Sequence, residues 1–296
     1  MISSPDVATV PVLKKRSTAQ VWWQLAIVSA LVGWLYAPIL ARLAKQWWTD
    51  PNFSHGFLVP VFSLYILCEK RAYLRALPHK PSWAGIGIVV FALFTLLLGV
   101  MSAELFLARA SFVILLGGLV VAFLGWQHLR VALFPWLFLL LMIPIPAIIF
   151  NQITFPLQFL TSKLASHALP LLGVPTLREG NVIRLPAMPL EVADACSGIR
   201  SLLSLGTLTV IYSYLFERRT AIRLTLTLAA VPIAVLANAL RIVGTGLLVQ
   251  YWDPTKAEGF FHGFTGWIAF LLSLGMIFLL HQMTCAIQRW QQRRRA

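Results

Sequence analysis

Charged residues are scarce in this sequence. Only 11% of its 296 residues are Asp, Glu, Lys or Arg, whereas 59% are hydrophobic. An ordinary soluble domain has about 25% charged residues, so this composition excludes that class and predicts an all-α polytopic membrane protein. The net charge is +14, but the basic residues lie in short runs between apolar segments. We therefore predict contact with membrane lipid head groups and no binding of nucleic acid.

Several signatures of cofactor chemistry are also missing from the sequence. It has no Gly-rich phosphate loop, no His-Glu-x-x-His sequence and no internal repeat. The histidines do not show a metal-ligand spacing with one another or with the three cysteines. The histidines considered for such a spacing are His128, His167 and His281. We expect catalysis, if any, without a metal or an organic cofactor.

Long apolar runs predict about eight transmembrane helices, since about 20 apolar residues span a bilayer. The predicted spans are residues 21–40, 56–68, 83–101, 105–125, 130–150, 197–216, 222–249 and 264–283. The second span is short unless it begins near Asn52, and Pro144 and Pro146 break the fifth near its end. A cleaved signal peptide is the alternative for the first run, but that run is longer than a typical signal core and lacks a clear cleavage site.

A more polar segment, residues 151–195, separates the fifth and sixth spans and forms a predicted insert on the outer face. Residues 153–172 predict an amphipathic helix at the membrane surface, because Gln158, Lys163 and His167 interrupt the apolar run. Residues 176–192 predict an extended hairpin that turns at residues 179–181.

Basic clusters give the predicted orientation. Residues 14–16, 218–219 and 293–295 are basic and fall on one side of the predicted topology, so the positive-inside rule places both termini in the cytoplasm. The predicted organisation is a cytoplasmic tail, one transmembrane domain that includes the insert, and a basic cytoplasmic tail. These parts comprise residues 1–20, 21–285 and 286–296.

Cys196 lies where the polar insert meets the sixth apolar run, at the predicted mouth of a helix. Unpaired N–H groups and the positive dipole end of a helix favour a thiolate, and Arg200 adds positive charge one turn later. Cys68 and Cys285 fall at the inner ends of spans, so Cys196 has no disulfide partner on its own side. The commoner role of a cysteine, as a small buried apolar residue, is the alternative.

Arg241 and His262 fall at the same predicted depth as Cys196. Arg241 lies in the outer third of the seventh span, where an arginine is costly and usually functional or paired. His262 precedes the eighth span. A thiolate, an imidazole and a guanidinium together suit nucleophilic attack on a carbonyl. Alternatively, Arg241 pairs with Asp194 or backbone carbonyls, and His262 is a polar interfacial residue.

Four short motifs resemble those of the exosortase and archaeosortase family of membrane cysteine transpeptidases. Residues 195–201 (ACSGIRS) resemble the cysteine motif and residues 238–242 (NALRI) the arginine motif. His262, with Gly266 four residues later, resembles the histidine motif, and residues 54–60 (SHGFLVP) an N-terminal feature. One departure is Asp194, where Glu is common in the family.

The resemblance implies a cysteine protease or transpeptidase of an inner membrane, with its active site on the periplasmic face. Cys196 would be the nucleophile, Arg241 the stabiliser of the oxyanion or substrate carbonyl, and His262 the general acid and base. Weaker supporting candidates are Arg200, Asn238, Asp194 and His55. The implied substrates are exported proteins with a C-terminal signal, which comprises a short motif such as Pro-Glu-Pro, a transmembrane helix and a basic cluster. The acceptor nucleophile is left open.

Two functions of other classes fit part of the sequence. A multi-pass transporter or flippase would use the intramembrane arginine for an anionic substrate, and the prolines within spans suit it. The absence of a repeat and the predicted surface position of the three residues argue against it. A transferase acting on lipid carriers in polysaccharide export is the second alternative.

Overall fold

The computed structural model describes residues 18–192, 198–252 and 260–295. The chain divides into two compact units, Met1–Arg42 and Leu43–Ala296, and each is considered by itself. Helix α1 (Thr18–Thr49) begins in the first unit and ends in the second. It covers the predicted first span and continues nine residues beyond residue 40, since the two alanines, the leucine and the glutamine that follow are good helix formers.

The described residues include seven helices that are long and apolar enough to cross a membrane, or up to eight if one bent pair counts as a span. This confirms the predicted all-α polytopic membrane protein. The second span begins at Pro51, as its short apolar run required. Asp50 caps it by accepting a hydrogen bond from the Asn52 amide at 3.0 Å. It comprises the 3-10 helix η1 (Pro51–Phe57) and α2 (Leu58–Glu69), and α3 (Arg71–Ala76) follows.

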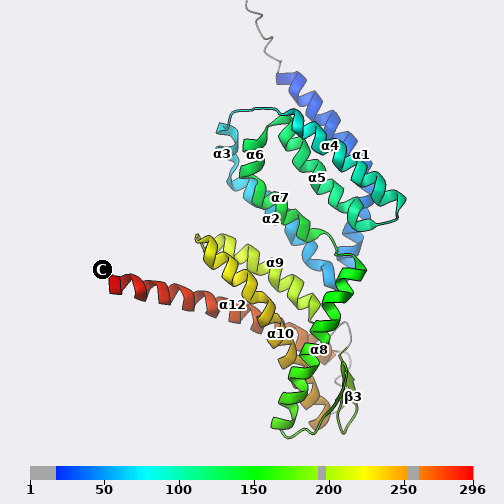
Figure 1. The fold of residues 1–296 in the computed structure, drawn as a ribbon, viewed down its shortest axis with the longest axis vertical. Helices are drawn as coiled ribbons and strands as arrows, with labels where there is room; N and C mark the ends of the chain where they lie inside the picture. Colours follow the sequence, from blue (N-terminus) through cyan, green and yellow to red (C-terminus); the bar gives the residue numbers. More distant parts are fainter. Residues whose placement is uncertain (1–17, 193–197, 253–259, 296) are drawn as a thin grey trace, which may run out of the picture. The chain divides into compact units, whose positions relative to one another are not determined.

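Helices α4 (Trp83–Met101) and α5 (Leu105–Phe123) form an antiparallel hairpin (Figure 1). Their backbones approach closely at glycines, as small residues allow in membrane helix pairs. A Cβ atom on Gly85 would lie 2.1 Å from the Ala122 backbone nitrogen, and one on Gly99 would lie 2.5 Å from that of Ala108. The hairpin therefore depends on the absence of side chains at these positions.

The predicted fifth span, residues 130–150, needs correction. Helices α6 (Trp126–Val131) and α7 (Leu133–Phe138) and the 3-10 helix η2 (Leu139–Met142) end at Met142. The chain then bends by 81° into α8 (Ala147–Leu171). The predicted proline break is real, but it ends the span, because Pro146 caps a new helix instead of interrupting an old one.

Helix α8 contains the segment predicted as a surface helix and is longer than expected. By itself it is not among the seven candidate spans, and it passes the same test only together with residues 133–142. Four of its polar side chains are buried against protein, which accounts for the interruption at Gln158, whereas Lys163 and His167 are exposed. The buried polar residues are Thr154, Gln158, Thr161 and Ser162.

The predicted hairpin is present and has a third strand. Strands β1 (Leu177–Glu179) and β2 (Val182–Arg184) pair antiparallel with Glu179 opposite Val182, which places the turn at residues 179–181 as predicted. Strand β3 (Pro189–Glu191) adds to β2 and gives the order β1-β2-β3. The sheet packs on α8 and on the C-terminal half of α10 through Ile183 and Val192.

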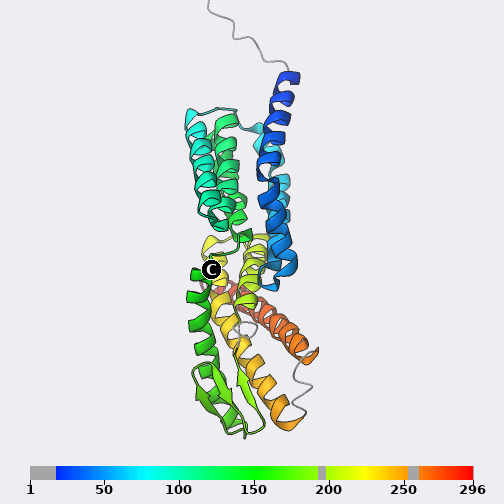
Figure 2. The same ribbon diagram turned by 90° about the vertical axis from the view of Figure 1, so that its right-hand side faces the viewer.

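Three helices hold the C-terminal half of the second unit together. Helices α9 (Ile199–Phe216) and α10 (Thr220–Tyr251) lie side by side, and α12 (Phe260–Arg295) packs against both (Figures 1 and 2). A small apolar core forms where they meet, around Leu205, Ala234 and Ile277. Helix α12 runs past the predicted end of the eighth span and includes most of the basic tail.

Gly85→Ala will destabilise the hairpin by about 1–3 kcal/mol, the usual cost of overpacking, because the new Cβ meets backbone that cannot move aside. Gly87→Ala on the same helix is the matched control, since nothing lies within 4 Å of its Cβ position. Thermal unfolding of both variants in detergent measures the difference. Equal midpoints would show that α4 and α5 do not pack as closely as described.

Candidate functional site

The first described residue of the cysteine motif, Gly198, precedes helix α9 in a conformation suited to glycine. Gly198 has φ +76°, in the left-handed region, and forms the N-cap of α9. Residues with a Cβ rarely adopt this conformation. Cys196 and Asp194 lie outside the described residues. The structure therefore gives the geometry of the motif from Gly198 onwards.

Gly198 joins the cysteine motif to the arginine motif. A Cβ atom at Gly198 would lie 3.0 Å from Cγ of Asn238, three residues before Arg241 on α10. Asn238 is buried, with 3% of its surface exposed. The amide side chain therefore packs directly on the glycine, and this contact fixes where α9 begins along α10.

The Arg241 side chain lies next to Gly266 of the histidine motif. It is partly buried on α10, and its guanidinium carbon and Nη2 lie 3.5 Å from the Cβ position of Gly266 on α12. His262 precedes Gly266 by four residues, about one turn, within the same helix. The side chain of His262 is outside the described part of the structure. Arg241 is thus in contact with the helix that carries His262.

A cavity of about 450 Å³ lies among these motifs. Its described lining has two arginines and no carboxylate, together with aromatic and hydroxyl groups. Positive charge in a partly apolar cavity favours a thiolate and a developing oxyanion. The lining residues are Pro51, Ser54, Gly198, Arg200, Ser201, Ser204, Arg241, Gly266, Trp267 and Phe270.

The supporting candidates take different positions. Arg200 is exposed, lines the cavity and donates a hydrogen bond of 3.5 Å from Nε to Oδ1 of Asn52, which connects α9 to η1. His55 is buried and is not among the described residues that line the cavity, whereas its neighbour Ser54 is. Of these two neighbours in the N-terminal motif, Ser54 lines the cavity.

Sequence reasoning missed four residues of the lining on α9 and α12: Ser201, Ser204, Trp267 and Phe270. The two serines could have been identified from their spacing in the sequence. Both follow Gly198 at steps of three residues, and positions three apart share a helix face. Trp267 and Phe270 could not be distinguished from lipid-facing residues without the contact between α9 and α12.

The sheet fixes the chain that enters the cysteine motif. Val192 is 1% exposed and packs in one core cluster with Ile242, the residue after Arg241. Asn181 hydrogen-bonds Val192 twice, through its carbonyl oxygen at 3.0 Å and its Nδ2 at 3.3 Å. Ser162 on α8 donates to the Gly180 carbonyl at 3.1 Å. The turn of the hairpin therefore links α8 to the segment before Cys196.

Comparison with known proteins agrees with this arrangement. The family model described as transmembrane exosortase matches residues 47–279, which include every motif and most of the chain. The chain belongs to the transmembrane exosortase family. No curated protein and no solved structure matches the sequence.

Membership gives the general activity of this exosortase. The family comprises membrane sorting enzymes that act as cysteine-type transpeptidases on exported proteins carrying sorting signals. The chain is accordingly a multi-pass membrane protein of that class. The cavity among its three motifs is the candidate active site.

Gly198→Ala will lower both the thermal stability of the exosortase and its activity, since alanine is strained at φ +76° and crowds Asn238. We expect a loss of about 1–2 kcal/mol. Gly206→Ala on the same helix is the control, because nothing lies within 4 Å of its Cβ position. Unfolding midpoints in detergent test this difference. A Gly198→Ala protein as stable as Gly206→Ala would refute the described contact.

Proposed function

We propose that this exosortase cleaves a C-terminal sorting signal through Cys196 and transfers the new C-terminus to an acceptor. The observation that supports the proposal most is the single cavity lined by residues of all three motifs, with Gly198 and Arg200 from the first, Arg241 from the second and Gly266 from the third. Cys196 belongs to the same motif as Gly198 and precedes it by two residues in the sequence.

The reaction begins with attack by the Cys196 thiolate on the scissile carbonyl carbon, which gives a tetrahedral oxyanion. The Arg241 guanidinium stabilises this negative charge. Collapse of the intermediate breaks the C–N bond, and His262 gives a proton to the leaving amine. A thioester joins the substrate to Cys196 at this stage.

The second half of the reaction reverses these roles. His262 removes a proton from the acceptor nucleophile, which attacks the thioester and releases the Cys196 thiolate. Water would compete with the acceptor, so the site needs cover. The sheet and α8 lie next to the chain that enters the cysteine motif and are well placed to provide it. We propose no metal and no organic cofactor for this reaction.

Two supporting residues act through others. Asn238 positions Gly198 and thereby the start of α9, whereas Arg200 adds positive charge at the cavity. Asp194 receives no role. We propose a Pro-Glu-Pro type of signal as the substrate motif, with its transmembrane helix docked among the spans in contact with lipid.

The proposed location is an inner membrane, with both termini in the cytoplasm and the cavity facing the periplasm. The basic runs of the sequence support this orientation. The tail helix α12 then ends on the cytoplasmic side with residues 293–295, while its first turns, including Gly266, lie at the periplasmic end. A transporter remains the alternative, and it predicts no dependence on the Cys196 thiol.

Cys196→Ala will abolish shortening of a tagged substrate protein that carries a Pro-Glu-Pro tail, because no thioester can form. Cys68→Ala is the matched control, since Cys68 is an exposed free cysteine on another helix. Coexpression followed by immunoblotting measures the substrate's size. If Cys196→Ala, inserted and folded, still shortens the substrate, Cys196 is not the nucleophile.

Arg241→Lys will slow substrate shortening by roughly 10²–10³-fold, the usual effect of losing one oxyanion donor, because lysine is a point charge without the planar guanidinium. Arg200→Lys should cost less than tenfold, since Arg200 is exposed, its hydrogen bond to Asn52 is long at 3.5 Å, and lysine keeps the positive charge. Rates from a time course of the same immunoblot separate the two arginines. Equal losses would remove the distinct role of Arg241.

A further inference from the structure

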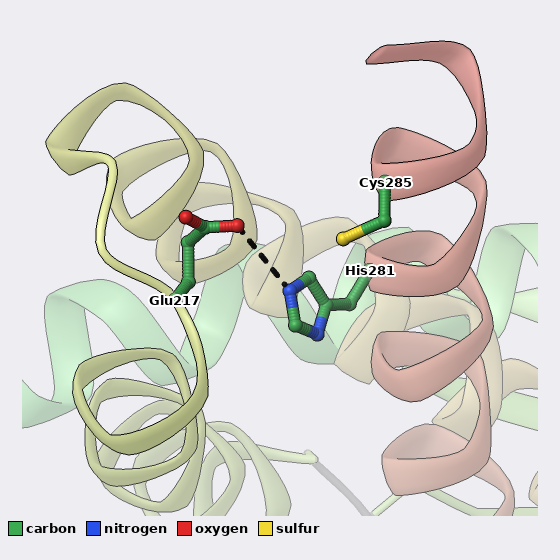
Figure 3. Close-up of side chains that lie close together, drawn as sticks. All are labelled: Glu217, His281 and Cys285. Atoms are coloured by element: carbon green, nitrogen blue, oxygen red, sulfur yellow. Dashed lines mark ion pairs between the residues drawn. The ribbon is translucent and has the colours of Figure 1, made fainter. Parts of the chain in front are cut away.

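Three potential metal ligands converge at the other end of α9 from the cavity. The carboxylate of Glu217, the imidazole of His281 and the thiol of Cys285 each present a ligand atom, and these atoms lie within 4.8 Å of one another (Figure 3). Glu217 is the C-cap of α9, so the cluster is separated from Gly198 by the whole helix, about 27 Å. It does not belong to the proposed active site.

Glu217 is held with one oxygen satisfied and the other facing the cluster. Its Oε1 accepts hydrogen bonds from the backbone amides of Arg218 at 2.7 Å and Arg219 at 2.8 Å. Its Oε2 lies 3.5 Å from Nε2 of His281.

His281 is buried, with 6% of its surface exposed, and a contact with Tyr212 orients its ring. The Tyr212 hydroxyl lies 2.8 Å from Nδ1. Nε2 of His281 makes no hydrogen bond of normal geometry with the described residues, and it lies 3.5 Å from Oε2 of Glu217, an ion pair when the ring is protonated (Figure 3). When Nδ1 donates its proton to Tyr212, Nε2 presents a lone pair towards Glu217. Metal-binding histidines are typically oriented by such an outer partner.

Cys285 follows His281 by four residues on α12, so both side chains lie on one face of the helix. It is partly buried, and it is a free cysteine. This His-x-x-x-Cys spacing carries no metal signal in the sequence by itself, because the third residue, Glu217, is remote in the chain. The fold brings the carboxylate to the pair where α9 ends beside α12.

We propose that Glu217, His281 and Cys285 bind a divalent transition-metal ion of the Zn²⁺ type. A carboxylate, an imidazole and a thiolate are all ligands of zinc, at about 2.0–2.3 Å. Ligand atoms of a tetrahedral site at those distances are about 3.3–3.8 Å apart, so the side chains need to move by about 1 Å. Solvent would supply the fourth ligand. The thiol excludes Mg²⁺ and Ca²⁺, which prefer oxygen ligands.

The consequence is a metal-dependent link between the C-terminal end of α9 and α12. Arg223 already stabilises the same end of α9, where its Nε donates to the Glu217 carbonyl at 2.6 Å and its Nη2 to the Tyr214 carbonyl at 2.9 Å. A bound ion would connect this capped end to His281 and Cys285. A polar network without metal is the competing interpretation, and Co²⁺ binding to the full chain distinguishes the two.

The test uses the full chain in detergent after chelator treatment, with Co²⁺ as the spectroscopic probe and Zn²⁺ as the competing ion. We expect a thiolate-to-cobalt charge-transfer band of unit stoichiometry, which Zn²⁺ removes and Mg²⁺ does not. Cys285→Ser and Glu217→Gln should lose or weaken it. Cys68→Ser should keep it, because Cys68 does not belong to the cluster. Absence of the band in wild-type protein would overturn the proposal.

A second measurement needs no disruption of the ligands. In a Cys68→Ala, Cys196→Ala double variant, Cys285 is the only thiol, and its maleimide labelling rate reports directly on the cluster. Zn²⁺ should slow labelling at least tenfold, whereas Mg²⁺ should not. Equal rates with and without Zn²⁺ would leave only the polar network. Neither result depends on substrate cleavage, so failure here is distinct from failure of the proposed transpeptidase.

Discussion

Hydrocarbon offers no hydrogen-bond partner to a peptide group, and this constraint organises the whole chain. Among the residues that the structure describes, the backbone is helical along the apolar runs and departs from helix where protein covers it or where a span ends. The three-stranded sheet packs on α8 and α10, and the left-handed turn at Gly198 packs on Asn238. Chemistry that requires non-helical backbone is therefore confined to helix ends, where the candidate site lies.

Much of this fold follows from the sequence because apolar runs are long and uninterrupted. Both ends of α4 (Trp83–Met101) agree with the predicted third span. The fifth span differed because periodicity cannot show whether a proline pair kinks one helix or separates two. The third strand was missed because it begins at Pro189, with Pro186 three residues earlier, and prolines weaken any strand signal.

The candidate site was predictable in its residue types and not in its geometry. The motifs around Cys196, Arg241 and His262 carry a resemblance that the family match supports, although the Cys196 and His262 side chains lie outside the described structure. Nothing in the sequence indicated that Arg241 would pass over Gly266, or that Asn238 would pack on Gly198. Such contacts depend on which faces of α9, α10 and α12 meet, and the apolar composition of all three hides those faces. The same limit concealed Glu217 as a neighbour of His281 and Cys285.

Helix α12 extends through 36 residues without a proline. Gly266 borders the cavity and His281 belongs to the metal-ligand cluster, fifteen residues further along the same helix. At 1.5 Å per residue the two are about 22 Å apart, and an unbroken helix keeps that interval constant. The helix thus acts as a fixed spacer. Lengthening it by one residue would rotate one end by about 100° relative to the other, so the two ends tolerate insertions between them only in whole turns.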